Sequence, residues 1–247
     1  MKLKFVLFFT VFGSLLLKAQ DPRLAIQYYA DGEYEKSLIL FQQLYQKSPS
    51  DDYYFKNYLN CLQALNKNDE AEALIKKEIQ NRPKDCSLYL LYGNTLLKTN
   101  QREKAEKQFK IAIDKLPPDV IFVYKLATGF IDNAHYDEAI EVYEKGEKIM
   151  KGISHFNYQL ADLYRRKGNI NQMLNYYLLA LEDGSVNQMS IQNLLQVYLP
   201  KDKIQEFQTM IFTRLEKKAD DIILVELLQW TYIQNKDFTN ALRQSKA

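Results

Sequence analysis

Residues 89–117 read YLLYGNTLLKTNQREKAEKQFKIAIDKLP, and their pattern gives the clearest indication of the fold. Gly93 is a small residue among large apolar residues at helical spacing. A second group follows, in which Ala105 precedes Phe109 by one helical turn, and Pro117 ends it because proline cannot continue a helix. The stretch therefore predicts two helices that pack antiparallel, with small residues where their backbones approach closely.

The same pattern recurs at intervals of 34 residues along the chain. Steps from Tyr28 reach a large residue each time: Leu62, Leu96, Phe130, Tyr164, Tyr198 and Tyr232. The track that begins at Ser37 is mostly small: Ala71, Ala105, Ala139, Met173, Phe207 and Ala241. A third track is large except at its end: Phe41, Ile75, Phe109, Tyr143, Tyr177, Ile211 and Ser245. No unit can bury its apolar stripe alone, so the tracks predict stacked helix pairs.

This repeat resembles the tetratricopeptide repeat family, whose period is 34 residues and whose pattern is Trp-x2-Leu-Gly-x2-Tyr, Ala-x3-Phe and Pro. The best copy has Tyr89, Tyr92, Gly93, Leu96, Ala105, Phe109, Ala112 and Pro117 at these places. The resemblance implies an all-α fold, a right-handed α-solenoid of stacked antiparallel helix pairs. It implies about seven units over residues 20–247: 18–51, 52–85, 86–119, 120–153, 154–187, 188–221 and an incomplete 222–247.

The later copies depart from the pattern. Met173 and Phe207 replace the small residue of the second helix, and Pro200 shortens the first helix of the sixth unit. We expect wider helix spacing or altered curvature over residues 170–215, unless compensating substitutions restore normal packing. Asp202 is a candidate cap for the helix that follows.

The start of the chain differs in character from the repeats. Lys2 and Lys4 precede an almost wholly apolar stretch, residues 5–17, and Ala19 offers a small residue at a cleavage point. This order is typical of a secretory signal peptide. The stretch is shorter than the ~20 residues of a spanning helix, and an uncleaved anchor is the alternative. Residues 1–19 thus predict export to a bacterial periplasm or cell envelope, with no stable membrane insertion after cleavage.

Composition and motifs point away from nucleic-acid binding and catalysis. The 33 Lys and Arg nearly balance the 31 Asp and Glu, and a net charge of +2 is no basic footprint for nucleic acid. His135 and His155 stand in no metal-binding spacing, and we find no phosphate loop or nucleophile motif, so we expect no metal, no cofactor and no enzyme. Cys61 and Cys86 fall at opposite ends of two predicted helices, which predicts thiols rather than a disulfide.

In tetratricopeptide arrays the first helix of each pair, helix A, lines a groove that binds peptides, and the resemblance implies the same here. The groove positions combine aromatic rings, amides and charges, as binding surfaces do. They are Tyr53, Lys56, Asn60, Gln63, Asn94, Lys98, Tyr124, Thr128, Asp132, Tyr158, Asp162, Arg165, Arg166, Gln192, Gln196 and Trp230. The implied partner is a protein or an extended peptide.

These features predict a non-catalytic scaffold of the periplasm or envelope that binds a partner in the groove. The content of Tyr, Asn and Lys, with a leader ending in Ala-Gln, resembles exported proteins of Bacteroidota. The last unit stops about one turn past Ala241, so the alternative is an N-terminal sensor or docking region of a longer protein with an enzymatic or signalling domain. Self-association through that unfinished end is a third hypothesis.

Overall fold

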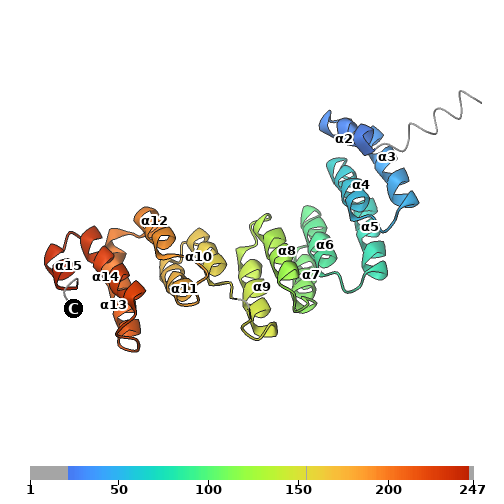
Figure 1. The fold of residues 1–247 in the computed structure, drawn as a ribbon. Coiled ribbons are helices and arrows are strands. Elements are labelled where there is room, and N and C mark those ends of the chain that lie inside the picture. The colour runs from blue at the N-terminus through green and yellow to red at the C-terminus, as the bar shows by residue number, and fades with distance from the viewer. Residues whose placement is uncertain (1–21, 154, 245–247) are drawn as a thin grey trace, which may run out of the picture. The chain divides into compact units, whose positions relative to one another are not determined.

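The computed structural model describes residues 22–153 and 155–244, and all regular structure in them is helical (Figure 1). The chain divides into two compact units, of which one ends at Ile111 and the other begins at Ala112. Within each unit, successive helices pack as antiparallel pairs, so the predicted all-α fold is confirmed. The predicted signal peptide, residues 1–19, lies outside the described residues.

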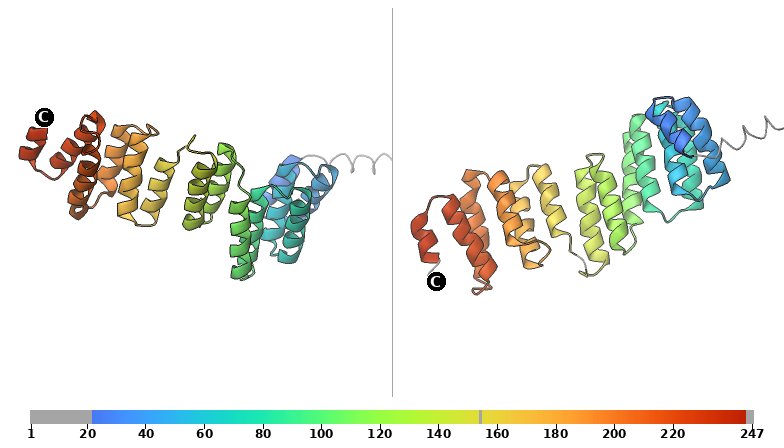
Figure 2. Two further views of the ribbon diagram at one scale, coloured as in Figure 1. Left: turned by 90° about the horizontal axis from the view of Figure 1, so that it is seen from below. Right: turned by 45° about the horizontal axis from the view of Figure 1, so that its top comes forward.

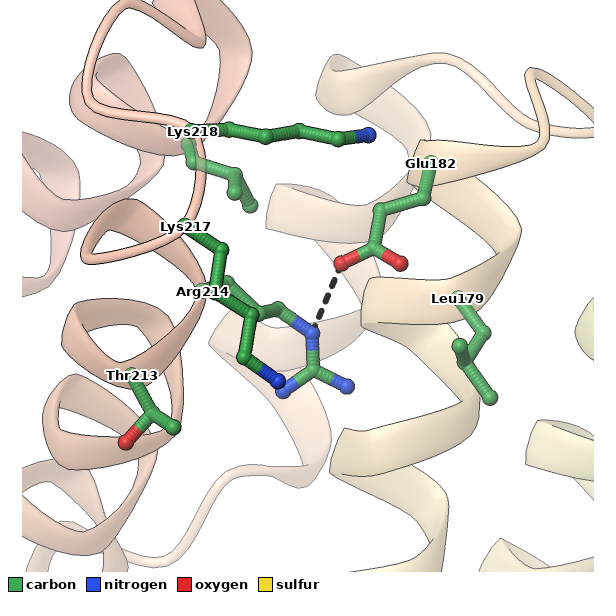
Figure 3. Close-up of a pocket in the computed structure, with 7 residues that line it drawn as sticks. Leu179, Glu182, Thr213, Arg214, Lys217 and Lys218 are labelled. Carbon is green, nitrogen blue, oxygen red and sulfur yellow. Dashed lines mark hydrogen bonds and ion pairs between the residues drawn. The ribbon is translucent and has the colours of Figure 1, made fainter.

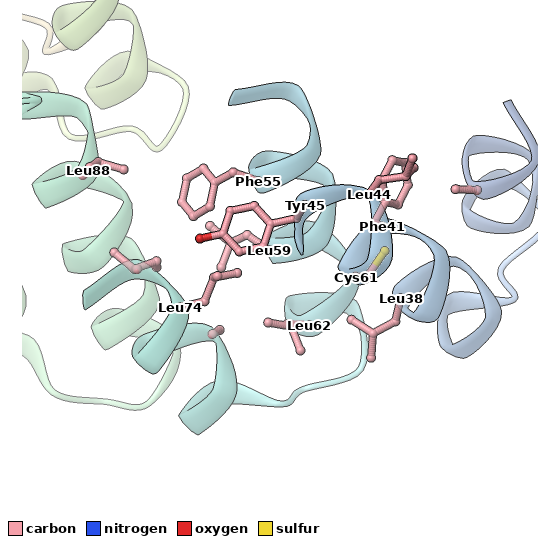
Figure 4. Packing of buried hydrophobic residues seen from close by; sticks show 13 residues of the cluster. Leu38, Phe41, Leu44, Tyr45, Phe55, Leu59, Cys61, Leu62, Leu74 and Leu88 are labelled. Carbon is pink, nitrogen blue, oxygen red and sulfur yellow. The ribbon is translucent and has the colours of Figure 1, made fainter. Parts of the chain in front are cut away.

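The first unit contains three helix pairs. Their helices are α2 (Pro22–Ala30), α3 (Tyr34–Lys47), α4 (Asp52–Ala64), α5 (Asn68–Asn81), α6 (Cys86–Lys98) and α7 (Arg102–Asp114), the last of which continues past the unit boundary. α3 packs against α2, its partner in the same pair, and also against α4, the first helix of the next pair. Neighbouring pairs are therefore in direct contact. Phe41, Tyr45 and Phe55 fill the space between these helices and belong to one continuous apolar core (Figure 4).

The second unit continues the same arrangement. Its elements are α8 (Val120–Ile131), α9 (Tyr136–Ile149), α10 (Asn157–Arg166), α11 (Ile170–Glu182), α12 (Gln188–Tyr198), the 3-10 turn η1 (Lys201–Lys203), α13 (Ile204–Leu215), α14 (Ile222–Gln234) and α15 (Phe238–Gln244). Figure 2 shows α10 and α11 side by side as an antiparallel pair. A second apolar core joins α10 to α14 and includes Met173, Tyr177 and Phe207.

Most helix A segments begin at a capping side chain that recurs every 34 residues. A side-chain oxygen accepts a hydrogen bond from a backbone N–H of the first turn, which supplies one of the partners that a helix start lacks. These bonds are Tyr53 N to Asp51 (2.9 Å), Ser87 N to Asp85 (3.0 Å), Ile121 N to Asp119 (2.8 Å), Ser190 N to Asn187 (2.9 Å) and Leu224 N to Asp221 (3.2 Å).

The fifth repeat, which begins at residue 154, lacks this cap at the start of its helix A. Ile153 stands at the equivalent place and has no side-chain acceptor, and α10 begins only at Asn157 with no side-chain cap. Helix A of this unit therefore starts later than the predicted boundary at residue 154. His155 precedes this helix rather than opening it, and its Nδ1 lies 2.6 Å from Oε1 of Glu147.

The turn between the two helices of a pair contains a residue with a left-handed backbone conformation, and this residue also recurs every 34 residues. Positive φ values occur at Gly32 (77°), Asn66 (55°), Asn100 (58°), Ala134 (58°), Gly168 (72°) and Lys236 (60°). The equivalent residue of the sixth unit, Asp202, lies in η1 instead, because Pro200 follows the end of α12 at Tyr198. The prediction that Asp202 caps the next helix is wrong, since Lys203 holds that place without a side-chain hydrogen bond.

The small and large tracks have the predicted burial. Every described member of the Ser37 and Phe41 tracks is buried; Ser245 lies outside the described residues. Met173 is fully buried and α10 and α11 are in contact, so the core of this pair contains the larger side chain. The Tyr28 track differs at its later end, where Tyr198 is 40% exposed rather than packed between units.

Candidate functional site

The predicted groove residues are divided between the two compact units. Those from Tyr53 to Lys98 lie on α4 and α6 in the first unit, and those from Tyr124 to Trp230 lie on or beside helices A of the second. None of them is buried. Each of the two compact units therefore has its own surface formed by helix A residues.

In the first unit the polar groove residues bond to one another across α4 and α6. Lys98 Nζ donates to Gln63 Oε1 at 2.9 Å, and Gln63 Nε2 donates to Thr95 Oγ1 at 3.3 Å. Lys56 instead forms an ion pair with Asp52 on its own helix at 2.7 Å. The structure thus brings Gln63 and Lys98 together and gives no such link to Tyr53, Asn60 or Asn94.

In the second unit the contacts run across three successive helices A. Gln159 Nε2 on α10 donates to the Tyr124 hydroxyl on α8 at 3.1 Å. The Arg165 guanidinium on α10 stacks over the Tyr198 ring on α12, 4.4 Å from its centroid. Tyr124, Gln159, Asp162, Arg165 and Tyr198 form a surface that we call the α8–α12 strip.

Asp162 organises the charge in the strip. Its Oδ1 accepts from Arg165 Nε at 2.9 Å and Nη2 at 2.6 Å, and its Oδ2 accepts from Arg166 Nε at 2.7 Å. Burial acts to raise the pKa of Asp162, but the bonds from Arg166 and Arg165 outweigh it and hold that pKa below its ordinary value. One carboxylate thus serves two guanidinium groups, which leaves a local excess of positive charge.

Tyr124 is the most firmly supported ring of the strip. It forms T-shaped ring contacts with Phe156 at a centroid distance of 5.5 Å and with Tyr143 at 6.0 Å. Phe156 and Tyr143 are buried, and burial raises the pKa of Tyr143 to about 12. Tyr124 itself is 39% exposed. A ring fixed on one edge and open on the other suits an interface, because little side-chain freedom is lost on binding.

Other predicted groove residues lie outside the strip. Trp230 and Tyr158 are half-buried and pack against the second apolar core, so part of each ring belongs to the interior. Thr128, Asp132 and Gln196 are exposed and Gln192 is half-buried on the same helices A.

Tyr198 and Gln159 belong to the strip but were not among the residues predicted from the sequence. Tyr198 belongs to a track whose members at Leu62, Leu96 and Phe130 are buried, so its position predicted a core residue. The signal that it differs was Pro200, which ends α12 at Tyr198 and so leaves this ring at the end of the helix.

The two rings of the α8–α12 strip, Tyr124 and Tyr198, are open to solvent. One hollow, of about 360 Å³, lies against Tyr45 and Tyr58 in the first unit. Another, of about 340 Å³, lies against Leu179 and Arg214 in the second. No predicted groove residue lines either hollow. An open strip of rings and charges fits an extended segment better than a small molecule.

The described residues hold no group of three or more His, Cys, Asp or Glu side chains placed to bind a metal ion. Cys61 and Cys86 are both buried and form no disulfide, as predicted, and Cys61 Sγ donates to Ser37 Oγ at 3.3 Å. Within residues 22–153 and 155–244 no helix has both the length and the apolar character to span a membrane.

Residues 154–182, which include α10 and α11, match the tetratricopeptide repeat family. The predicted resemblance is thus confirmed for this helix pair, and the caps and turns described above place the other pairs in the same register. No curated protein matches the chain.

Several solved structures are similar to the chain at low sequence identity. A tetratricopeptide repeat protein from Parabacteroides merdae is 12% identical, with 91% of this chain and 89% of that one covered and a TM-score of 0.40. MamA is 18% identical, with 65% and 94% covered and a TM-score of 0.37. Naa15/Naa10 bound to HypK-THB is 18% identical, with a TM-score of 0.39; 91% of this chain is covered but only 35% of that one. These scores are low, and the fold is defined by the chain's own helix pairs.

Proposed function

We propose that this protein is a non-catalytic tetratricopeptide scaffold whose α8–α12 strip binds an extended segment of another protein. The observation that carries the proposal is the linkage of three helices A by Tyr124, Gln159, Arg165 and Tyr198. Rings, an amide and a charge-paired arginine are the side chains that dominate protein interfaces. Because Asp162 already fixes Arg165, the strip is arranged before a partner arrives.

A position-specific crosslink tests this proposal. A photoreactive phenylalanine analogue replaces Tyr124 on the strip or, as the control, Glu141, which is exposed on α9. We expect one discrete adduct from position 124 in intact cells and none from position 141. Adding Arg165→Ala to the Tyr124 variant should abolish that adduct. Equal adducts from both positions, or an adduct that ignores Arg165, would contradict binding at the strip.

We also propose that the protein is exported to the periplasm or envelope of a bacterium such as a member of the Bacteroidota. Support comes from the basic, apolar and small residues of segment 1–19. Mass spectrometry of the N-terminus from whole cells should find a mature chain that begins near Gln20. A chain that keeps Met1 in the soluble cytoplasmic fraction would refute export.

The alternative, that the chain is a docking region of a longer protein, stays a prediction. Sequencing the reading frame beyond Ala247 tests it directly, and a following catalytic or signalling domain would support it.

A further inference from the structure

A second surface of the molecule combines a hollow with a fixed arginine and two lysines (Figure 3). The hollow measures about 340 Å³ and lies between α11, α13 and the start of α14. Its lining includes Leu179, Glu182, Arg214, Lys217, Lys218 and Leu224. No member of the α8–α12 strip contributes to it.

Arg214 is held in place from three directions. Its Nε donates to Glu182 Oε1 at 2.8 Å, its Nη2 donates to Asn175 Oδ1 at 2.8 Å, and its Nη1 donates to the Met210 carbonyl at 3.2 Å. The ion pair with Arg214 neutralises the charge of Glu182, so this wall of the hollow is fixed in position and carries no unpaired carboxylate. The half-buried Leu179 supplies apolar surface beside it, and Leu224 below is 1% exposed and belongs to the core.

Lys217 and Lys218 provide the charge that is not compensated. Both are exposed and, within the described part of the chain, neither forms an ion pair. The lining thus carries three cations against the one carboxylate of Glu182. The nearby Asp221 carboxylate caps α14 at Leu224 N, and Glu216 and Asp220 do not line the hollow.

We propose that this hollow binds an acidic peptide segment that carries an apolar side chain beside a carboxylate. The carboxylate lies between Lys217 and Lys218, and the apolar side chain covers Leu179. A volume near the lower end of ligand pockets, which span ~300–1,000 Å³, matches one or two side chains. An inorganic anion would leave Leu179 uncovered, and an apolar ligand would desolvate the ammonium groups without pairing them.

The test is an NMR titration of the isotopically labelled chain with the peptide Ac-Glu-Leu-Glu-NH2. We expect saturable shifts of the backbone amides of Leu179, Lys217, Lys218 and Leu224. The neutral peptide Ac-Gln-Leu-Gln-NH2 should leave these signals in place. Absence of shifts with the acidic peptide, or equal shifts with the neutral one, overturns the proposal.

Two charge-reversed variants complete the test. Lys217→Glu with Lys218→Glu should weaken binding of the acidic peptide about tenfold, because attraction becomes repulsion at two places. Lys107→Glu with Lys110→Glu, at exposed positions of α7, makes the same change in net charge and should not alter binding. Both sites are exposed, so the variants should keep the helical circular dichroism spectrum. Equal weakening by both variants, or shifts of the same size with inorganic phosphate, overturns the peptide assignment. Neither result bears on the α8–α12 strip.

Discussion

Ala134 shows how the backbone conformation that the repeat requires can conflict with a side chain. Its φ of 58° lies in the left-handed region, where a Cβ atom costs about 1 kcal/mol that glycine avoids. Gly32 and Gly168 occupy the same place in other units. We predict that Ala134→Gly raises the free energy of unfolding by about 1 kcal/mol, measured by urea denaturation.

The matched control is the same exchange inside a helix. Ala73 is exposed within α5, where glycine loses backbone entropy and lowers stability by about 1 kcal/mol. A gain in stability for Ala134→Gly together with a loss for Ala73→Gly would show that the backbone conformation of the turn determines the effect of glycine. Destabilisation by both would contradict the argument for Ala134.

Asp162 gives the strip a defined response to acid. Its pKa lies below the ordinary value because the bonds from Arg166 and Arg165 outweigh burial, so the folded chain binds this proton less readily than the unfolded chain. That stabilisation is present above the ordinary aspartate pKa of about 3.9 and is lost as pH falls through the lower folded-state pKa. We predict that Asp162→Asn lowers stability at pH 7 and makes it decline less steeply in the acid range. Urea denaturation at several pH values measures this, with Asp132→Asn, an exposed carboxylate on α8's C-terminal side, as the control.

At the element scale, capping decides where helix A begins. Asp119 accepts from Ile121 N at 2.8 Å, whereas Ile153 offers no acceptor and α10 starts late. We predict that Asp119→Ala lowers the free energy of unfolding by about 1 kcal/mol and that Asp119→Asn, which keeps an acceptor, loses much less. Asp69→Ala is the control, since Asp69 lies in the first turn of α5 and is not its capping residue. Equal losses for the Ala and Asn variants of Asp119 would argue against the cap.

The spacing between α6 and α7 depends on Gly93. A Cβ atom there would lie 2.2 Å from Cε1 of Phe109, so the Phe109 ring of α7 occupies the space that a side chain at residue 93 of α6 would need. We predict that Gly93→Ala lowers stability by about 1–3 kcal/mol, measured by urea denaturation. Phe109→Leu should recover part of this loss in the Gly93→Ala background. If the two substitutions were simply additive, the clash would not be the cause.

For the whole molecule, stacking predicts that such damage stays local. In a repeat stack each helix pair contacts only its neighbours, so stability is a sum of local terms. Hydrogen exchange of the Gly93→Ala variant should therefore rise in α6 and α7 and remain unchanged in α13, α14 and α15. A uniform rise through the chain would mean that it unfolds as one cooperative body.

The sequence predicted the repeat better than its exceptions. Buried positions such as Phe41 and Ala71 recur because packing between helices requires them in every copy. The late start of α10 depends on one absent acceptor at Ile153, and the exposure of Tyr198 depends on Pro200 nearby, so a regular track could not show either. The α8–α12 strip was predicted only in part, because its contacts join residues on different helices.

The evenly spaced caps also mark where the gene could be cut and rejoined. A segment such as residues 51–84 opens with its own capping aspartate, Asp51, carries its own left-handed turn at Asn66, and ends just before Asp85. A duplicated copy would bring the cap that its first helix needs, since Lys84 would be followed by Asp51, a capping aspartate like the Asp85 that follows it now. Such modules can lengthen or shorten the chain by whole repeats, while a cut at Ile153 would meet no equivalent junction.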